Sequence, residues 1–302
     1  MKVIKKPVKN NIVTITYLLM LIGSTLPLII LREIFNIDPD WLLQTQTILF
    51  AIILGTIIFI NKVKKLKLFV LMILLLMGTQ WLTNIIQDLS AWNNIFSGIS
   101  NNFILMLMKG QLLRLAAALL IFVVLLYIKK KPKNFFIAKG DIAAEVKPIK
   151  FILTEPSNWK KFGFTFSIYL SLGTLIFLIV AGGIPSLDKL ISIIPIFPLI
   201  IIFAAINSFY EELGYRAALI SVLEDKIGSK HSLYLSSLFF GLGHFYGVPY
   251  GIVGVLMAIF LGYILGKSML ETRGFFWAFF IHMILDILIF SFMAFNMIIP
   301  GG

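Results

Sequence analysis

Glutamate, histidine and aspartate occur at three places inside long apolar stretches of this sequence. Ionisable side chains at membrane depth cost at least about 2.5–3.5 kcal/mol each on insertion scales, so they usually serve a function. These residue types also activate water as general acids and bases, and the pattern therefore predicts an enzyme embedded in a membrane. The three fragments are Glu211-Glu212-Leu-Gly-Tyr-Arg216, Phe240-Gly-Leu-Gly-His244 and His282-Met-Ile-Leu-Asp286.

The composition is that of a membrane protein. Of the 302 residues, 59% are hydrophobic and 13% are charged, and the mean hydropathy is +0.98. A soluble domain has about 25% charged and about 45–50% apolar residues, so the sequence predicts an all-α, polytopic integral membrane protein. Cysteine is absent, which excludes disulfides, thiolate–metal sites and a cysteine nucleophile.

A membrane-spanning helix needs about 20 mostly apolar residues, and about nine runs in the sequence meet this requirement. The stretch 232–267 is nearly continuous and is interrupted only by Gly247-Val-Pro249-Tyr-Gly251. Glycine and proline together favour a turn, so we predict two helices there, and one bent helix is the alternative. The predicted spans are 12–31, 42–60, 66–87, 111–128, 162–181, 198–223, 232–249, 250–267 and 275–298.

The basic residues predict the orientation of these helices. With the N-terminus in the cytoplasm, 21 of the 26 Lys and Arg residues lie on the cytoplasmic side, three lie outside, and Arg114 and Arg216 fall within spans. This bias follows the positive-inside rule, and the basic cytoplasmic loops are expected to attract anionic lipid headgroups. The net charge of +12 is thereby explained without a nucleic-acid partner. The cytoplasmic residues include Lys2, Lys5, Lys6 and Lys9.

The polar fragments are predicted to lie at one depth in the membrane. The expected helix ends place Glu211, His244 and Asp286 twelve residues from the cytoplasmic surface, which is about 18 Å at 1.5 Å per residue. His282 lies eight residues in, about 12 Å. We therefore expect these side chains to line one cavity, open to the cytoplasm or sideways between helices.

Spacing within the fragments suggests further contacts. Glu212 and Arg216 are four residues apart, so they share a helix face and are expected to pair. Glu211 points about 100° away from Glu212 and is free to meet a different partner. Asn207 lies one turn before Glu211 on the same face and either lines the cavity or bonds a neighbouring helix.

The three fragments resemble the motifs of the CAAX protease and bacteriocin-processing family, also called the Abi family of intramembrane proteases. These motifs are Glu-Glu-x-x-x-Arg, Phe-x-x-x-His and His-x-x-x-Asn or Asp, and the resemblance covers roughly residues 160–298. It implies a multi-helix core with a polar cavity that opens toward the cytoplasm. We accordingly expect an N-terminal four-helix membrane region at 1–135, a cytoplasmic linker at 136–161 and a catalytic membrane domain at 162–302.

The resemblance and the residue types together assign provisional roles. Glu211 is expected to act as general base on a water molecule, assisted by His244, with His282 and Asp286 stabilising the oxyanion or holding the water. A carboxylate cannot donate to an oxyanion unless it is protonated, so Asp286 is better suited to orienting His282 or binding a metal. Glu212 and Arg216 are expected to give structural and electrostatic support, and Phe240 to pack against the cavity.

Metal dependence is open at the level of sequence. His244, His282 and Asp286 could supply three zinc ligands and leave one position free. The alternative is a glutamate-dependent protease without a metal. No His-Glu-x-x-His sequence, which would indicate a zinc protease, occurs in the chain.

The expected substrate is a membrane-associated peptide or protein. Abundant Lys, Ile and Asn suit a bacterial protein of the cell membrane, so bacteriocin or signal-peptide processing, or immunity, is favoured over prenyl-protein processing. One alternative is a non-catalytic scaffold or immunity protein of the same fold. Another is a transporter, a class that usually contains inverted repeats and broken helices; the sequence has no clear repeat.

Overall fold

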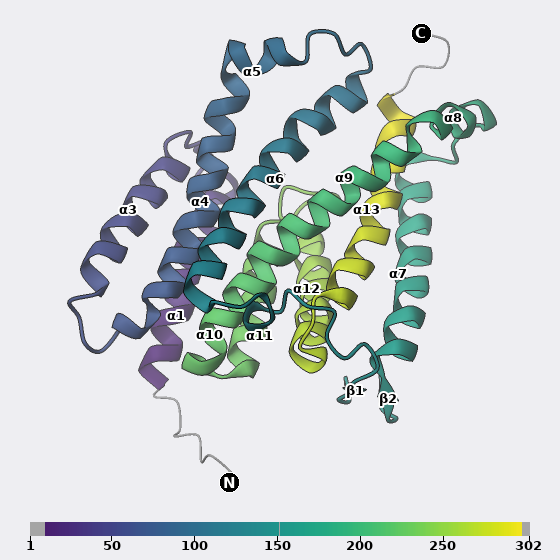
Figure 1. The fold of residues 1–302 in the computed structure, drawn as a ribbon. Coiled ribbons are helices and arrows are strands. Elements are labelled where there is room, and N and C mark those ends of the chain that lie inside the picture. The colour runs from purple at the N-terminus through teal and green to yellow at the C-terminus, as the bar shows by residue number, and fades with distance from the viewer. Residues whose placement is uncertain (1–9, 151, 298–302) are drawn as a thin grey trace. The chain divides into compact units, whose positions relative to one another are not determined.

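The structure, a computed structural model, describes residues 10–150 and 152–297 and is almost entirely helical (Figure 1). Lys2, Lys5, Lys6 and Lys9 lie outside the described residues. The α-helices are α1 (Asn10–Ile22), α2 (Leu26–Ile29), α3 (Leu42–Ile57), α4 (Lys67–Asp88), α5 (Ser90–Ile95), α6 (Asn102–Lys129), α7 (Trp159–Gly182), α8 (Leu187–Ser192), α9 (Phe197–Glu211), α10 (Leu219–Ile227), α11 (Ser229–Leu242), α12 (Ile252–Thr272) and α13 (Phe276–Met297).

Short elements complete the chain. Within the described ranges, the only sheet is an antiparallel pair of two-residue strands, β1 (Glu145–Val146) and β2 (Ser157–Asn158), in the predicted linker. Two segments of the described chain are π-helical, η1 (Ile30–Ile34) and η5 (Glu212–Ala218). The described residues also contain the 3₁₀-helical segments η2 (Lys64–Leu66), η3 (Pro132–Phe135) and η4 (Ile194–Ile196).

The described chain divides into two compact units, each assembled from segments that are distant in sequence. The first unit contains the described part of 1–82 together with 214–267, and the second contains 83–213 together with the described part of 268–302. The sequence-based division at residues 135 and 161 stays a prediction.

In the first unit, α11 packs against α1 and α10. The chain bends by 54° between α1 and the segment 26–34. The chain is tightly packed at this bend, because a Cβ on Gly23 would lie 2.7 Å from Ile73 Cγ2 and 2.8 Å from Phe50 Cζ. Pro27 stands in the first turn of α2, where proline is tolerated. The apolar run 12–31, which the sequence predicts as one span, is therefore a bent pair of helices.

In the second unit, α9 packs against α13 and α6, and α13 also packs against α7. Helices surrounded by lipid gain little from the hydrophobic effect, so van der Waals packing and interhelical hydrogen bonds hold them together. Aromatic and aliphatic side chains from α6, α9 and α13 supply this packing. The buried cluster contains Phe103, Leu107, Ile193, Ile200, Phe203, Ala204, Phe290, Phe292, Ala294 and Phe295.

The apolar helices fit a multi-pass membrane protein, but the predicted count of nine spans is not confirmed. Among the described residues, six helices are long and apolar enough to cross a membrane, or seven if the bent pair forms one span. The predicted spans 42–60 and 232–249 form helices of only 16 and 14 residues, short of the roughly 20 that a bilayer requires. The stretch 232–267 contains two helices, as predicted, because α11 ends at Leu242 and α12 begins at Ile252. The cytoplasmic position of the N-terminus stays a prediction.

Two glycines of α7 provide a matched test of how closely α7 and α13 pack. A Cβ on Gly163 would lie 2.5 Å from Trp277 Cε3, and the indole is held by a hydrogen bond from its Nε1 to the Ile142 carbonyl (3.0 Å). We expect Gly163→Ala to destabilise the protein by about 1–3 kcal/mol through overpacking. A Cβ on Gly173 would meet nothing within 4 Å, so Gly173→Ala should be neutral. Thermal unfolding in detergent measures both, and equal melting temperatures for the two variants would contradict the close contact.

Candidate active site

Helix α9 carries the first motif at its C-terminal end. Asn207 and Glu211 lie one turn apart, and the Asn207 amide Nδ2 donates to Glu211 Oε1 (3.3 Å). Glu212 caps α9 and begins the π-helical segment η5. Such π-helical turns are rare and occur frequently at functional sites.

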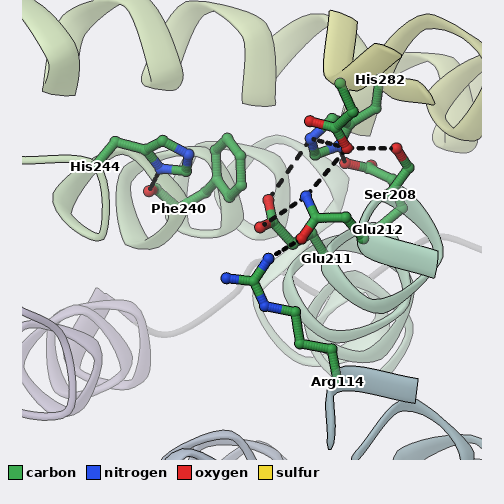
Figure 2. Close-up of polar contacts among 9 residues, drawn as sticks. Arg114, Ser208, Glu211, Glu212, Phe240, His244 and His282 are labelled. Carbon is green, nitrogen blue, oxygen red and sulfur yellow. Dashed lines mark hydrogen bonds and ion pairs between the residues drawn. The ribbon is translucent and has the colours of Figure 1, made fainter. Parts of the chain in front are cut away.

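Helix α13 brings an imidazole to these glutamates. The Glu212 Oε1 atom accepts a hydrogen bond from His282 Nδ1 (2.7 Å). The other ring nitrogen, Nε2, lies 3.6 Å from Glu211 Oε2 and 3.7 Å from Asp286 Oδ2. One imidazole thus joins three carboxylates from two packed helices (Figure 2).

Asp286 is held by donors from α9. Its Oδ2 atom accepts hydrogen bonds from Asn207 Nδ2 (3.0 Å) and from Ser208 Oγ (2.8 Å). The Asn207 amide therefore touches both Glu211 and Asp286. The sequence leaves two roles open for Asn207, lining the cavity or bonding a neighbouring helix. Its hydrogen bond to Asp286 on α13 is a bond to a neighbouring helix.

Sequence reasoning missed two residues of this cluster. Ser208 could have been found from its spacing, because it lies four residues before Glu212 and so shares a helix face with it. Arg114 on α6 donates from Nη1 to Asn207 Oδ1 (Figure 2). The sequence did hold a signal for Arg114, since it is one of two arginines inside the predicted spans, where a cation usually has a partner.

The acidic side chains differ in their access to solvent. The side chain of Glu211 is 15% exposed, whereas Glu212 is fully buried and Asp286 is 7% exposed. A general base must reach a water molecule, so Glu211 is the best placed of the three. Glu212, in contrast, is suited to holding His282.

The second motif and Arg216, the last residue of the first motif, lie in the first unit. The Arg216 guanidinium is fully buried and lies 3.5 Å from the centre of the Phe240 ring. The His244 ring packs on Phe240 with centroids 4.2 Å apart, and its Nδ1 donates to the Phe240 carbonyl (2.9 Å). His244 follows the end of α11 at Leu242, so it stands in a turn and not inside the helix predicted at 232–249.

A polar contact anchors the loop that follows His244. The Tyr250 hydroxyl donates to Glu33 Oε1 (2.7 Å), and the Arg32 guanidinium lies 5.3 Å from the centre of the Tyr246 ring. The hydrogen bond to the Glu33 carboxylate raises the pKa of Tyr250 to about 12. The phenol therefore remains a donor through neutral pH, and the loop stays tied to η1.

The sequence pairs Glu212 with Arg216, and this pairing stays a prediction. In the structure the Glu212 carboxylate accepts from His282 in the second unit, and Arg216 stacks on Phe240 in the first. The separation of about 100° between Glu211 and Glu212 assumed 3.6 residues per turn, which does not hold in η5. Both glutamates approach the same imidazole, one at each ring nitrogen.

The zinc ligands considered from sequence were His244, His282 and Asp286. Among the residues that the structure describes, no group of three or more histidine and acidic side chains is arranged to hold a metal ion. The Asp286 Oδ2 atom is instead engaged by the donors Asn207 and Ser208. The reaction proposed below does not use a metal ion.

Long apolar helices that carry a buried cluster of acidic and imidazole side chains fit a multi-pass membrane protein. Residues 193–288 match the family described as Rce1-like, Type II CAAX prenyl endopeptidase Rce1-like. The match includes all three motifs and confirms the family resemblance for this part of the chain. No curated protein and no solved structure matches the chain.

Proposed function

We propose that this protein is an intramembrane endopeptidase that hydrolyses a peptide bond in a membrane-associated peptide or protein. One observation carries the proposal: the His282 imidazole lies between Glu211, Glu212 and Asp286. This cluster falls within the segment that matches a family described as an endopeptidase. Carboxylates and imidazole in mutual contact can move a proton between water and a leaving group.

In the proposed reaction Glu211 takes one proton from a water molecule. The water oxygen forms a bond to the carbonyl carbon of the substrate, and the carbonyl oxygen becomes an oxyanion. When the carbon–nitrogen bond breaks, the proton passes to the leaving amine nitrogen and the oxyanion returns to a carboxyl group. Glu211 suits this role because it is the most exposed carboxylate of the cluster.

The other groups position the base and the imidazole. Glu212 holds His282 by accepting a hydrogen bond from the imidazole Nδ1 atom. The other ring nitrogen, Nε2, is then directed to Glu211 and Asp286. Asp286 orients His282 and is itself held by Asn207 and Ser208. His244 is proposed to assist the water or the oxyanion. Its Nδ1 is held by a backbone carbonyl, so Nε2 is the atom that would act.

The substrate is proposed to be a bacteriocin or signal peptide, or a protein involved in immunity, and not a prenylated protein. The support is compositional, because the Lys, Ile and Asn content suits a bacterial cell-membrane protein. The N-terminus is proposed to face the cytoplasm. Basic segments such as Lys129-Lys-Lys-Pro-Lys133 would then contact anionic lipid headgroups.

A comparison of membrane peptides in cells tests this proposal. Cells that express the wild-type protein should lack, or contain cut, at least one peptide that stays intact in cells expressing Glu211→Gln. Glu155→Gln is the matched control, because it makes the same chemical change in an exposed loop and should behave as wild type. Identical peptide profiles for the wild type and Glu211→Gln would refute the protease and favour a non-catalytic membrane protein.

A further inference from the structure

Arg114 contacts the active-site cluster from outside the segment that matches the family. It lies near the middle of α6, whereas the match begins at residue 193. Its Nη1 atom donates to Asn207 Oδ1 across the contact between α6 and α9. In Figure 2 the Arg114 side chain reaches from its own helix toward the group around Glu211.

Asn207 connects this arginine to two carboxylates. A primary amide has one acceptor oxygen and a nitrogen with two N–H donors. The oxygen accepts from Arg114, and the nitrogen donates to Glu211 Oε1 (3.3 Å) and to Asp286 Oδ2 (3.0 Å). In the observed orientation, the oxygen and the nitrogen of the Asn207 amide therefore both have hydrogen-bond partners.

The charges on the two sides of the amide favour the same orientation. If the amide were rotated by 180°, its oxygen would face the two carboxylates and its N–H groups would face the guanidinium. Asn207 is only 5% exposed, so water cannot readily substitute for these partners. The arginine thus holds the amide oxygen while the amide nitrogen holds Glu211 and Asp286.

The position of Arg114 near the middle of α6 indicates a role beyond packing. An arginine in the middle of a membrane helix is costly and usually has a functional partner. The carboxylates of Glu211 and Asp286, which share the Asn207 nitrogen, also repel each other. The Arg114 cation on the far side of the amide attracts both of them and so offsets this repulsion. Lys109 on the same helix differs, because its Nζ donates to Asn93 Oδ1 (2.7 Å).

We infer that Arg114 is a positioning residue of the active site, which acts through Asn207 to hold Glu211 and Asp286 in the geometry that hydrolysis requires. The inference rests on the proposed function and gives the N-terminal half of the chain a role in the reaction. Because Arg114 acts through another residue, its removal should lower turnover without weakening substrate binding.

Steady-state kinetics tests this role in vesicles of phosphatidylglycerol and phosphatidylcholine. The probes are synthetic peptides with one transmembrane segment each, and kcat and KM are measured for the peptide that is cut fastest. A displacement of about 1 Å in a reacting group can cost about 100-fold in rate, so we expect Arg114→Gln to lower kcat by about 100-fold at unchanged KM. Arg114→Lys, which keeps a charged donor, should retain more activity. Lys109→Gln is the matched control and should match the wild type.

A double-mutant cycle separates action through Asn207 from a general structural role. Asn207→Leu keeps the approximate shape of the side chain and removes its hydrogen bonds. In that background Arg114→Gln should cause little further loss of kcat, because its route to the carboxylates is already gone. Additive losses, wild-type kcat in Arg114→Gln, or a rise in KM alone would each overturn the inference.

Melting temperatures in detergent keep this inference distinct from the proposed function. They are measured for the wild type, Arg114→Gln, Asn207→Leu and the double variant. If the wild type hydrolysed none of the peptides, the proposed function would fail. The melting temperatures would still test the coupling between Arg114 and Asn207. We expect the shift of the double variant to differ from the sum of the two single-variant shifts. Additive shifts would show that the two side chains are not coupled, whatever the activity of the protein.

Discussion

Replacing Glu211 with glutamine is expected to abolish measurable peptide hydrolysis by the purified protein. General-base catalysis contributes about 10²–10⁴-fold to a rate, and glutamine keeps the size and hydrogen-bonding groups of glutamate while removing its basicity. Its oxygen can still accept from Asn207 Nδ2, as Glu211 Oε1 does. We therefore expect normal accumulation in membranes and a melting temperature close to that of the wild type. Cleavage of the vesicle-bound peptides, followed by mass spectrometry, is the measurement.

Glu212→Gln is the comparison for this prediction. Glu212 is fully buried against His282 Nδ1, and glutamine can still accept that hydrogen bond. We expect a smaller fall in activity than for Glu211→Gln. A variant pair in which Glu212→Gln is inactive and Glu211→Gln retains most activity would mean that the roles of the two glutamates are reversed.

Arg216→Ala is expected to reduce the amount of protein in membranes and to lower its melting temperature strongly. The guanidinium is fully buried over the Phe240 ring, and a desolvated cation–π contact contributes about 2 kcal/mol or more. The sequence also predicts a pair between Arg216 and Glu212, and removing one partner of a buried ion pair typically costs about 3–5 kcal/mol. Quantitative immunoblotting and thermal unfolding in detergent measure the two effects.

Arg273→Ala is the control for that loss. Arg273 also faces an aromatic ring, with its guanidinium 5.9 Å from the centre of Phe136, but it is exposed. Exposed cation–π contacts contribute about 0.5–1 kcal/mol, so the melting temperature should change little. Normal accumulation and stability of Arg216→Ala would contradict a structural role for the buried arginine.

The class of fold was predictable from sequence because lipid imposes a strong compositional rule. Apolar runs and their polar interruptions predicted most helix positions, including the break between α11 and α12. The lengths of the helices were less predictable. The bend after α1 depends on the space that Phe50 and Ile73 leave beside Gly23, and the early end of α11 at Leu242 is not visible in hydropathy. These features decide how many helices are long enough to span, so the number nine was not confirmed.

Contacts within one helix of the candidate site could be predicted from the spacing of residues in the sequence, and contacts between helices could not. The contact between Asn207 and Glu211 follows from a separation of one helical turn. The approach of Glu212 to His282 depends on the π-helical segment η5, which simple periodicity does not predict. Arg114 and Asn207 are 93 residues apart, and only the packing of α6 against α9 brings them together.

Hydrolysis in ¹⁸O-labelled water tests the central claim, that Glu211 activates water for direct attack on a peptide bond. The purified protein in vesicles is given transmembrane peptides for many turnovers, and mass spectrometry then locates the label. Direct attack predicts ¹⁸O in the new C-terminal carboxylate of the cut peptide and none in the Glu211 side chain. Label in the Glu211 carboxylate would indicate a covalent acyl intermediate and contradict its role as general base, and the absence of any labelled product would contradict hydrolysis itself.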